Sequence, residues 1–303
     1  MTTGSNPLVS VVIASVNGIE LLSECLEHLV RQEGGHPYEV LVVDRCGETL
    51  RQDLKRRFPQ PEIQVFAAPE GTSIPKLRAM GMAQARGKTV AILEDHCNVN
   101  PNWFDTIARL TAEGCEAMGG PVRNGAVDRL IDWAVFFVEY ARFMPPIAAG
   151  EVGAIAGSSA VYDRAMLGRL APELGQEVWE HVLHARMHEL GVKFVNDPGL
   201  EVEHKKEFPF GYFMSQRYHY SRSFAGTRLE GASIVKRIAY AGATVLLPPL
   251  LLWRMARILA GKGGQMSRFV AAFPLLLAFM ASYAWGEAMG ALTGPGDSLA
   301  RVE

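Results

Sequence analysis

The chain has 303 residues, of which 49% are hydrophobic and 20% are charged, and its formal net charge is −2. This composition supports a packed core and excludes an intrinsically disordered protein. A charge so close to zero gives no global electrostatic reason for binding nucleic acid. The four cysteines form no CxxC pair, which favours reduced thiols in the cytosol over a disulfide framework.

Short apolar runs and amphipathic segments alternate through the first third of the chain. Each apolar run is rich in β-branched residues, the pattern of a strand buried on both faces. The runs predict strands over residues 8–14, 38–44, 63–67 and 89–93. The other segments predict helices over residues 19–32, 74–86 and 100–114, the last with Asn100 as its N-cap. This alternation predicts a parallel sheet with right-handed crossovers.

Polar side chains follow three of these strands where each strand ends. Ser15-Val16-Asn17 follow the first strand, Asp44 ends the second, and Glu94-Asp95-His96 follow the fourth. Open α/β sheets bind ligands at the carboxyl ends of their strands. Carboxylates and an imidazole gathered there can hold a divalent cation, which in turn can hold a diphosphate. No GxGxxG or GxxxxGKS/T motif follows the first strand, which argues against a dinucleotide-binding fold and a P-loop.

The last third of the chain contains two uncharged runs, residues 238–253 and 269–286. A membrane-spanning helix needs about 20 apolar residues, so the second run is long enough and the first is marginal. We expect these runs to attach the chain to a membrane. Two buried helices of a soluble bundle are the alternative, although such helices usually keep a polar face.

The link between the two runs is basic, with Arg254, Arg257, Lys262 and Arg268. If the preceding domain is cytoplasmic and both runs cross the membrane, this link lies on the extracytoplasmic side. That position is against the tendency of basic residues to stay on the cytoplasmic side. A first run that re-enters or lies in the interface, bent at Pro248-Pro249, would keep the link in the cytoplasm. We favour this form, but the sequence leaves spanning, re-entry and interfacial binding of residues 238–253 open.

Taken in order, these motifs resemble those of the family 2 glycosyltransferases, which have the GT-A fold. VSVVIASVN resembles the family's first strand and its turn onto the nucleotide, and EVLVVDRCGE resembles the second strand. GTSIPKLRAMGMAQARGKTVAILEDH resembles the helix and the metal motif that follow. The resemblance covers about residues 8–228. It implies an α/β fold with a GT-A-like Rossmann-type, mostly parallel sheet flanked by helices over residues 1–228, then interfacial and membrane-associated helices over residues 229–303.

The resemblance implies a nucleotide-sugar site at three strand ends and in the helix before the fourth strand. Asp44 would contact the nucleobase, and Glu94 would face the ribose or a metal. The family usually has an Arg-Asn pair in the helix, whereas here Arg78 is followed by Ala79. The full set of implied nucleotide-sugar contacts is Ala14, Ser15, Asn17, Asp44, Arg78, Glu94 and Asp95.

His96 stands where the family has a metal-binding aspartate, so the resemblance implies metal ligation by Asp95, His96 and His204. Imidazole suits Mn²⁺ better than Mg²⁺ and adds no negative charge, so we expect a weak site that prefers Mn²⁺. The metal should be lost as His96 takes up a proton near its ordinary pKa of about 6.5.

Two later segments resemble the acceptor side of the family's site. IAGSSAVYDRAML implies that Gly157 and Ser158 line the donor or acceptor sugar, together with Trp179. The segment EVWEHVLHARMHELG resembles the helix that carries the catalytic base. Its register implies Glu180 as the base, with Glu177 as the alternative.

Two further segments resemble the family's contacts to the diphosphate. DPGLEVEH implies that His204 lies at the diphosphate or the metal. SQRYHYSRSFAGTR implies that Arg217 and Arg222 bind the diphosphate, but it lacks the Arg-Trp ending of processive members. A processive polymerase is therefore not expected.

The implied reaction is an inverting, metal-dependent transfer, of the hexosyltransferase type, from a nucleotide diphosphosugar to a lipid-linked or amphipathic acceptor. We expect it at the inner (cytoplasmic) membrane, with the catalytic domain facing the cytoplasm. One alternative is a non-catalytic, membrane-anchored protein that keeps the fold for binding or scaffolding. A nucleotidyltransferase would need a basic glycine-rich loop after the first strand, and the sequence has none there.

Overall fold

The structure, a computed structural model, describes residues 6–174 and 180–302. The chain divides into two compact units, each made of two separate stretches. Unit 1 comprises residues 1–125 and 143–206, and unit 2 comprises residues 126–142 and 207–303. The boundary predicted after residue 228 is a different kind of boundary, because it separates a catalytic part from a membrane-associated part. It stays a prediction.

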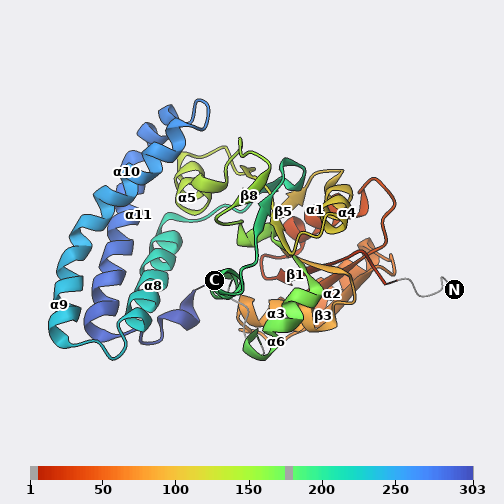
Figure 1. The fold of residues 1–303 in the computed structure, drawn as a ribbon, viewed down its shortest axis with the longest axis horizontal. Helices are drawn as coiled ribbons and strands as arrows, with labels where there is room; N and C mark the ends of the chain where they lie inside the picture. Colours follow the sequence, from red (N-terminus) through yellow and green to blue (C-terminus); the bar gives the residue numbers. More distant parts are fainter. Residues whose placement is uncertain (1–5, 175–179, 303) are drawn as a thin grey trace. The chain divides into compact units, whose positions relative to one another are not determined.

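Unit 1 is built on a sheet of eight strands in the order β3-β2-β1-β4-β9-β6-β10-β8 (Figure 1). The four predicted strands form one parallel half of it, in which β1 pairs with both β2 and β4. Strand β9 then runs antiparallel to its neighbours β4 and β6. The predicted α/β class is confirmed. The strands are β1 (Val9–Ser15), β2 (Tyr38–Asp44), β3 (Ile63–Ala67), β4 (Thr89–Glu94), β6 (Ala117–Gly119), β8 (Gly150–Val152), β9 (Val161–Asp163) and β10 (Phe194–Asn196).

The helices of unit 1 pack on this sheet through apolar stripes and close backbone approach. The buried face of α1 consists mainly of residues spaced three or four apart, such as Leu22, Leu26 and Leu29. Helix α3 lies so close to β1 that a Cβ atom on Gly81 would come within 2.4 Å of Val12 Cγ1. The α-helices are α1 (Ile19–Val30), α2 (Glu48–Arg57), α3 (Ile74–Gln84), α4 (Trp103–Ala112), α6 (Arg164–Leu174) and α7 (Glu180–Glu189).

The start of α4 differs from the prediction. The helix begins at Trp103 with Asn102 as its N-cap, not at Pro101 with Asn100. Strand β5 (residues 97–99) ends just before Asn100, and residues 101–102 form a turn that precedes the helix. The Asn100 side chain instead donates a hydrogen bond to the carbonyl oxygen of Gly199 at 2.9 Å.

A second sheet in unit 1 brings two distant parts of the chain together. It contains β5 (Cys97–Val99), β11 (Val202–His204) and β7 (Val122–Asn124), with β11 in the middle. Strands β5 and β11 are antiparallel, and their register pairs Cys97 with His204. Because β5 begins one residue after His96, this pairing places His204 beside His96.

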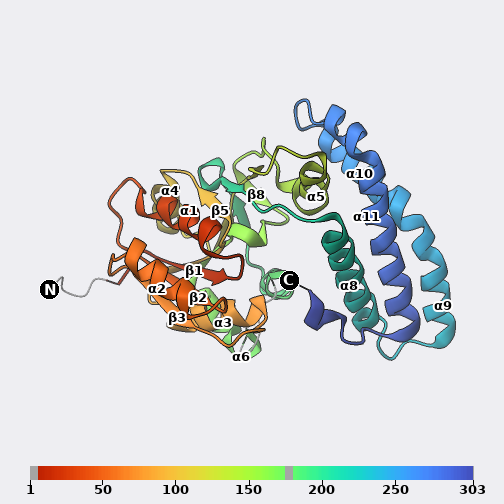
Figure 2. The same ribbon diagram turned by 180° about the vertical axis from the view of Figure 1, so that it is seen from behind.

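Unit 2 is helical. Its helix α11 packs against all the other α-helices that the structure describes in this unit. Figures 1 and 2 show α11 between α8 and the α9–α10 pair. The helices are α5 (Leu130–Tyr140), α8 (Phe210–Arg228), α9 (Ile234–Ala243), α10 (Leu247–Ala260) and α11 (Met266–Thr293). Short 3-10 turns in the two units are η1 (Ala141–Phe143), η2 (Gly157–Ser159), η3 (Pro198–Leu200), η4 (Thr244–Leu246) and η5 (Ser298–Arg301).

The prolines in the first uncharged run lie just after a short 3-10 turn in its helical segment. Pro248 and Pro249 lie in the first turn of α10, where a missing N–H donor costs little. Turn η4 joins α9 to α10, so a helical segment continues from Ile234 to Ala260. The bend predicted at these prolines stays a prediction.

Two helical segments among the described residues, Ile234–Ala260 and Met266–Thr293, are long and apolar enough to cross a membrane. Only 22% and 39% of their most apolar windows are buried in the fold. Large apolar side chains such as Val245, Trp253 and Val270 are more than half exposed. An exposed apolar surface of this kind marks an interaction site and argues against two buried helices of a soluble bundle.

The pairing of α7 with the sheet leads to a prediction about acid stability. His184 Nε2 lies 2.7 Å from the buried hydroxyl of Tyr162. Burial, with the nearby charges of His188 and His181, lowers the pKa of His184 to about 4. Between pH 6.5 and pH 4 the unfolded chain therefore binds a proton that the folded chain does not, and stability falls as the pH falls.

We expect wild-type protein to lose about 1–3 kcal/mol more than His184→Gln between pH 7 and pH 4. Glutamine keeps a hydrogen-bonding group near Tyr162 but cannot titrate. Urea unfolding of both proteins at the two pH values measures the difference. Equal losses in the two proteins would contradict this assignment.

Candidate active site

The carboxyl edge of the parallel half gathers the polar residues that follow β1, β2 and β4. Asp95 is fully buried and holds the turn after β1. The backbone N–H groups of Val16 and Asn17 donate to its Oδ2 at 2.8 and 2.9 Å, and the Asn17 amide donates to its Oδ1 at 2.6 Å. The His96 Nδ1 atom also lies 2.9 Å from Oδ1. Asp95 thus positions Asn17 and His96, and its predicted direct contacts to metal and nucleotide stay predictions.

Asp44 is held in a similar way at the end of β2. Its Oδ1 accepts hydrogen bonds from the Ser15 hydroxyl at 2.9 Å and from the Cys46 N–H at 3.0 Å. Its Oδ2 accepts from the Gly47 N–H at 3.1 Å and pairs with Arg51 at 3.0 Å. The structure therefore places Ser15 and Asp44 together, next to the buried Ala14 of β1. The nucleotide contacts predicted for these three residues stay predictions.

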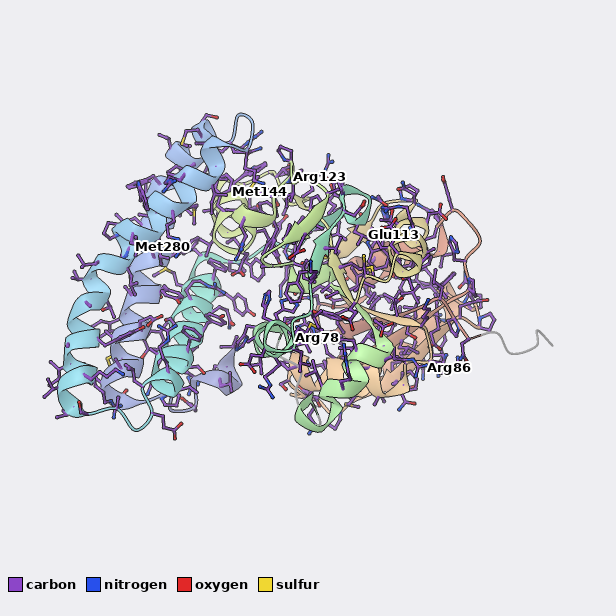
Figure 3. All side chains as sticks on the ribbon, in the orientation of Figure 1. Arg78, Arg86, Glu113, Arg123, Met144 and Met280 are labelled. Carbon is purple, nitrogen blue, oxygen red and sulfur yellow. The ribbon has the colours of Figure 1, made fainter. Side chains whose placement is uncertain are left out.

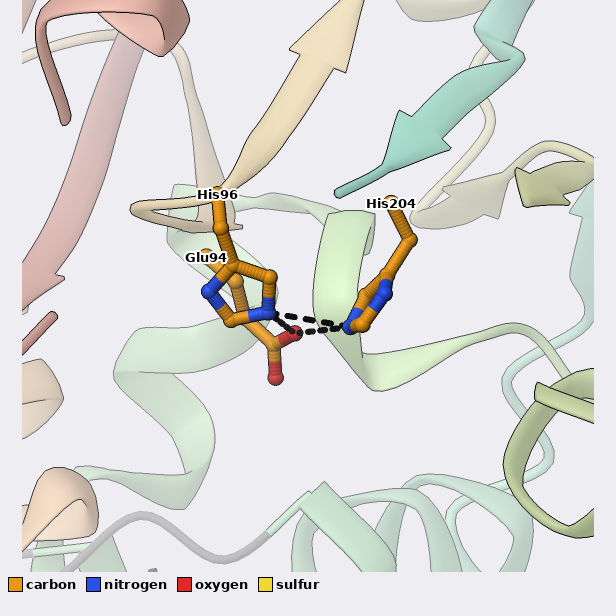
Figure 4. A group of neighbouring side chains, drawn as sticks. All are labelled: Glu94, His96 and His204. Atoms are coloured by element: carbon orange, nitrogen blue, oxygen red, sulfur yellow. Dashed lines mark hydrogen bonds and ion pairs between the residues drawn. The ribbon is translucent and has the colours of Figure 1, made fainter. Parts of the chain in front are cut away.

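Three side chains at this edge could hold a metal ion: Glu94, His96 and His204. Figure 4 shows the two imidazoles meeting beside the carboxylate, with His96 just after β4 and His204 at the end of β11. Both histidines are buried, and Glu94 is partly buried. His96 Nε2 lies 2.9 Å from His204 Nε2 and 3.2 Å from Glu94 Oε2, and His204 Nε2 lies 3.6 Å from the same oxygen.

These distances fit a metal site. At bond lengths of about 2.0–2.2 Å, neighbouring ligands of a tetrahedral or octahedral ion lie about 2.8–3.6 Å apart. Two imidazoles and one carboxylate are a known ligand set for divalent transition metals. The contact between the two Nε2 atoms needs one proton between the rings, and a cation bound there would replace that proton. Two members, His96 and His204, coincide with the predicted metal ligands.

The charges in the cluster favour an ionised carboxylate. Burial opposes the charge of Glu94, but the hydrogen bond from His96 and the charges of His96, His204 and Arg78 outweigh it and hold the pKa of Glu94 well below its usual value. Burial also opposes a charge on His96, yet its bonds to Asp95 and Glu94 raise its pKa. Burial and the neighbouring His96 lower the pKa of His204 to about 3. Protons should therefore compete with a metal at His96 from a higher pH than the 6.5 expected from sequence.

Arg78 of α3 joins this cluster to the predicted base. Its guanidinium pairs with Glu94 at 3.3 Å and also forms an ion pair with Glu180 at the start of α7. Arg78 is labelled in Figure 3 and is 7% exposed. Sequence reasoning assigned Arg78 to the nucleotide but missed its pairing with Glu180, because 102 residues separate the two. The ion pair holds the predicted base beside the candidate metal site.

The predicted sugar-lining segment lies against the same carboxylate. A Cβ atom on Gly157 would come within 2.7 Å of Glu180 Cγ, so a glycine is needed for this approach. The hydroxyls of Ser158 and Ser159 are buried and have no hydrogen-bond partner within residues 6–174 and 180–302. Unpaired buried hydroxyls in this segment, beside the predicted base, are candidate contacts for a sugar.

Four further predicted site residues belong either to the undescribed part of the chain or to unit 2. Trp179 and Glu177 fall outside the described residues. Arg217 and Arg222 belong to α8 of unit 2, where Arg217 pairs with Glu139 at 2.7 Å and Arg222 donates to the Gly294 carbonyl at 3.4 Å. Their predicted contacts to the diphosphate stay predictions.

The fold and the site define an α/β enzyme of the GT-A type, with acidic and imidazole groups at the carboxyl edge of its sheet. The profile of the glycosyl transferase family 2 matches residues 10–170, more than half of the chain. The chain therefore belongs to the glycosyl transferase family 2 and is a glycosyltransferase, as its motifs predicted.

Individual proteins similar to this chain include a curated relative and a solved structure. The succinoglycan biosynthesis protein ExoO of Rhizobium meliloti (strain 1021) is 30% identical over 124 residues, which cover 41% of this chain and 33% of that protein. The aligned part thus spans about a third of the length of this relative. The crystal structure of S. aureus TarS 1-349 in complex with UDP has a TM-score of 0.50 at 15% identity, covering 92% of this chain and 90% of that chain. This likeness concerns the fold alone.

Proposed function

We propose that this glycosyltransferase moves a sugar from a nucleotide diphosphosugar to an acceptor hydroxyl with inversion at the anomeric carbon. The observation that carries the proposal is the chain of contacts from Glu180 through Arg78 to Glu94 and the two histidines. These contacts join Glu180, a candidate base, to a candidate metal site at the carboxyl edge of the sheet, which supports the proposal. The UDP named for the similar TarS structure supports a nucleoside diphosphate as the leaving group.

In this mechanism Glu180 takes the proton of the acceptor hydroxyl. The acceptor oxygen forms a bond to the anomeric carbon, and the bond from that carbon to the diphosphate breaks. The nucleoside diphosphate leaves with the electron pair, on the face opposite the attack. Arg78 orients the Glu180 carboxylate, and Ser158 and Ser159 offer hydroxyls for the sugar.

Glu94, His96 and His204 would hold a divalent cation, Mn²⁺ in preference to Mg²⁺ because two ligands are imidazoles. When bound, such a cation supplies positive charge for the departing diphosphate. Asp95 fixes the His96 ring through Nδ1, which leaves Nε2 directed at the site.

A hydrolysis assay tests the proposal directly. Purified full-length protein is incubated with UDP-, GDP- and dTDP-linked sugars, with Mn²⁺ or with excess chelator, and the release of nucleoside diphosphate is measured. We expect release from one donor class, dependent on metal. Absence of release from every donor, with nucleotide binding retained, would favour a non-catalytic binding or scaffold protein.

We also propose that unit 2 attaches the enzyme to the cytoplasmic face of the inner membrane, where it meets a lipid-linked or amphipathic acceptor. The exposed apolar side chains of α9, α10 and α11 support attachment. Helix α8 carries Arg217, Arg222 and Arg228 and packs along α11. Charged side chains are costly in hydrocarbon, so this packing supports helices that lie in the membrane interface rather than helices that span the membrane twice.

Labelling from either side of the membrane tests this topology. We expect Gly263→Cys, in the loop between α10 and α11, to react only from the cytoplasmic side. The exposed Cys46 of unit 1 is replaced by serine in the protein that carries Gly263→Cys. In the protein that keeps Cys46, labelling of this cysteine reports on which side of the membrane the catalytic unit lies. Reaction of Gly263→Cys from the outside alone would contradict the interfacial form, and release of the protein by a carbonate wash would contradict insertion.

A further inference from the structure

A pocket of about 270 Å³ lies among α5, α8, α10 and α11, entirely within unit 2. Three arginines from three different elements line it: Arg142 of η1, Arg217 of α8 and Arg254 of α10. Glu139 is the one carboxylate in the described lining. The pocket therefore has an excess of two positive charges and is suited to an anion.

The arginines are not all neutralised by the protein. Glu139 pairs with Arg217 at 2.7 Å, and the Arg217 guanidinium also lies over the Phe213 ring at 4.9 Å. The Arg217 Nε atom is buried and lacks a hydrogen-bond partner among the described residues. Arg254 makes no hydrogen bond or ion pair within the described part of the chain. The unsatisfied donors of Arg217 and Arg254 favour a ligand with several acceptor oxygens, such as a phosphate.

The rest of the lining is apolar. Leu251, Met255 and Ile258 form one stripe along α10, facing Phe137 of α5 and Met280 of α11 (Met280 is labelled in Figure 3). The neighbouring α10 residue Trp253 is 55% exposed. An ion that is wholly water-soluble gains nothing from such walls, whereas a phosphate carrying a hydrocarbon chain buries that chain against them.

We propose that this pocket binds the phosphate headgroup of an anionic lipid. The phosphate lies at Arg142, Arg217 and Arg254, and the first part of the hydrocarbon packs on Met255 and Ile258. The volume is close to the lower end of the range of about 300–1,000 Å³ for ligand pockets, enough for a headgroup and the start of a chain. For Arg217 this is an alternative to the diphosphate contact predicted from the sequence. The site does not depend on sugar transfer.

Binding of dodecyl phosphate to the full-length protein in dodecyl maltoside, followed by calorimetry, tests the pocket. We expect one molecule per chain and weaker binding of inorganic phosphate, which lacks the chain. Arg254→Gln and Arg142→Gln should each raise Kd at least about tenfold, because each removes a charged contact. Arg257→Gln is the matched control, since Arg257 is on the same helix, lies over the Trp253 ring and does not line the pocket. It should change Kd less than about twofold.

Two competitors distinguish the lipid sources. Displacement by phosphatidylglycerol identifies a bulk phospholipid, and displacement by decaprenyl phosphate alone identifies a polyprenyl phosphate. Thermal unfolding and nucleotide binding check that each variant is folded. Unchanged dodecyl phosphate affinity in both arginine variants would overturn the proposal. So would inorganic phosphate binding as tightly as dodecyl phosphate, or displacement by neither lipid.

Discussion

Glu180→Gln is expected to lower kcat for sugar transfer by about 10²–10⁴-fold, the usual contribution of a general base. An amide cannot take the proton of the acceptor hydroxyl, but it can still accept a hydrogen bond from Arg78 and keep that side chain in place. The donor KM should change less than about threefold, because the lost interaction belongs to the transition state. Steady-state kinetics with a saturating acceptor measure both quantities.

Glu189→Gln is the matched control for this experiment. Glu189 is an exposed carboxylate at the other end of α7 and pairs with Arg186. We expect it to leave kcat at the wild-type value. Wild-type turnover in Glu180→Gln would place the base elsewhere, and Glu177 would be the next residue to replace.

His204→Ala is expected to weaken Mn²⁺ binding at least about 100-fold, because loss of partners that merely orient ligands already costs 10–100-fold. Transfer should then require much higher Mn²⁺, and excess chelator should abolish it in both proteins. His36→Ala is the control, since His36 pairs with Asp105 and is outside the cluster. Mn²⁺ titration of activity and calorimetry without substrate report the affinity, and full activity in chelator would exclude a metal role.

His96→Asp tests the preference between the two metals. An aspartate adds negative charge and a hard oxygen ligand, so we expect activity with Mg²⁺ to rise relative to activity with Mn²⁺. The ratio of the two activities is the measurement. An unchanged ratio would mean that His96 does not contact the ion.

The sequence predicts those parts of the fold that strong local patterns encode. The four parallel strands are continuous apolar runs, and the polar residues after them mark the site edge in advance. Helix α2 was missed because it buries only Leu50 and Leu54 and is otherwise highly charged. The β5-β11-β7 sheet was also missed, because strands of three residues leave almost no periodic signal.

The candidate site is only partly local in the sequence. Glu94, Asp95 and His96 are adjacent, so their proximity follows from the chain itself. His204 was assigned through the resemblance to the family. Its place beside His96 follows from the pairing of His204 with Cys97 across the sheet, which no local pattern reveals. No local pattern reveals the ion pair between Arg78 and Glu180 either. Nor does one reveal that residues 126–142 belong to the same compact unit as the C-terminal helices.

The contact between His96 and His204 also closes a loop, because 108 residues separate the two histidines. Residues 126–142, which leave unit 1 for unit 2 and return, lie inside this loop. A cation held by both histidines acts as a clip, and clips that close long loops remove the most freedom from the unfolded chain. A site loaded with a cation would therefore make the catalytic unit more resistant to proteolysis than the same unit without one.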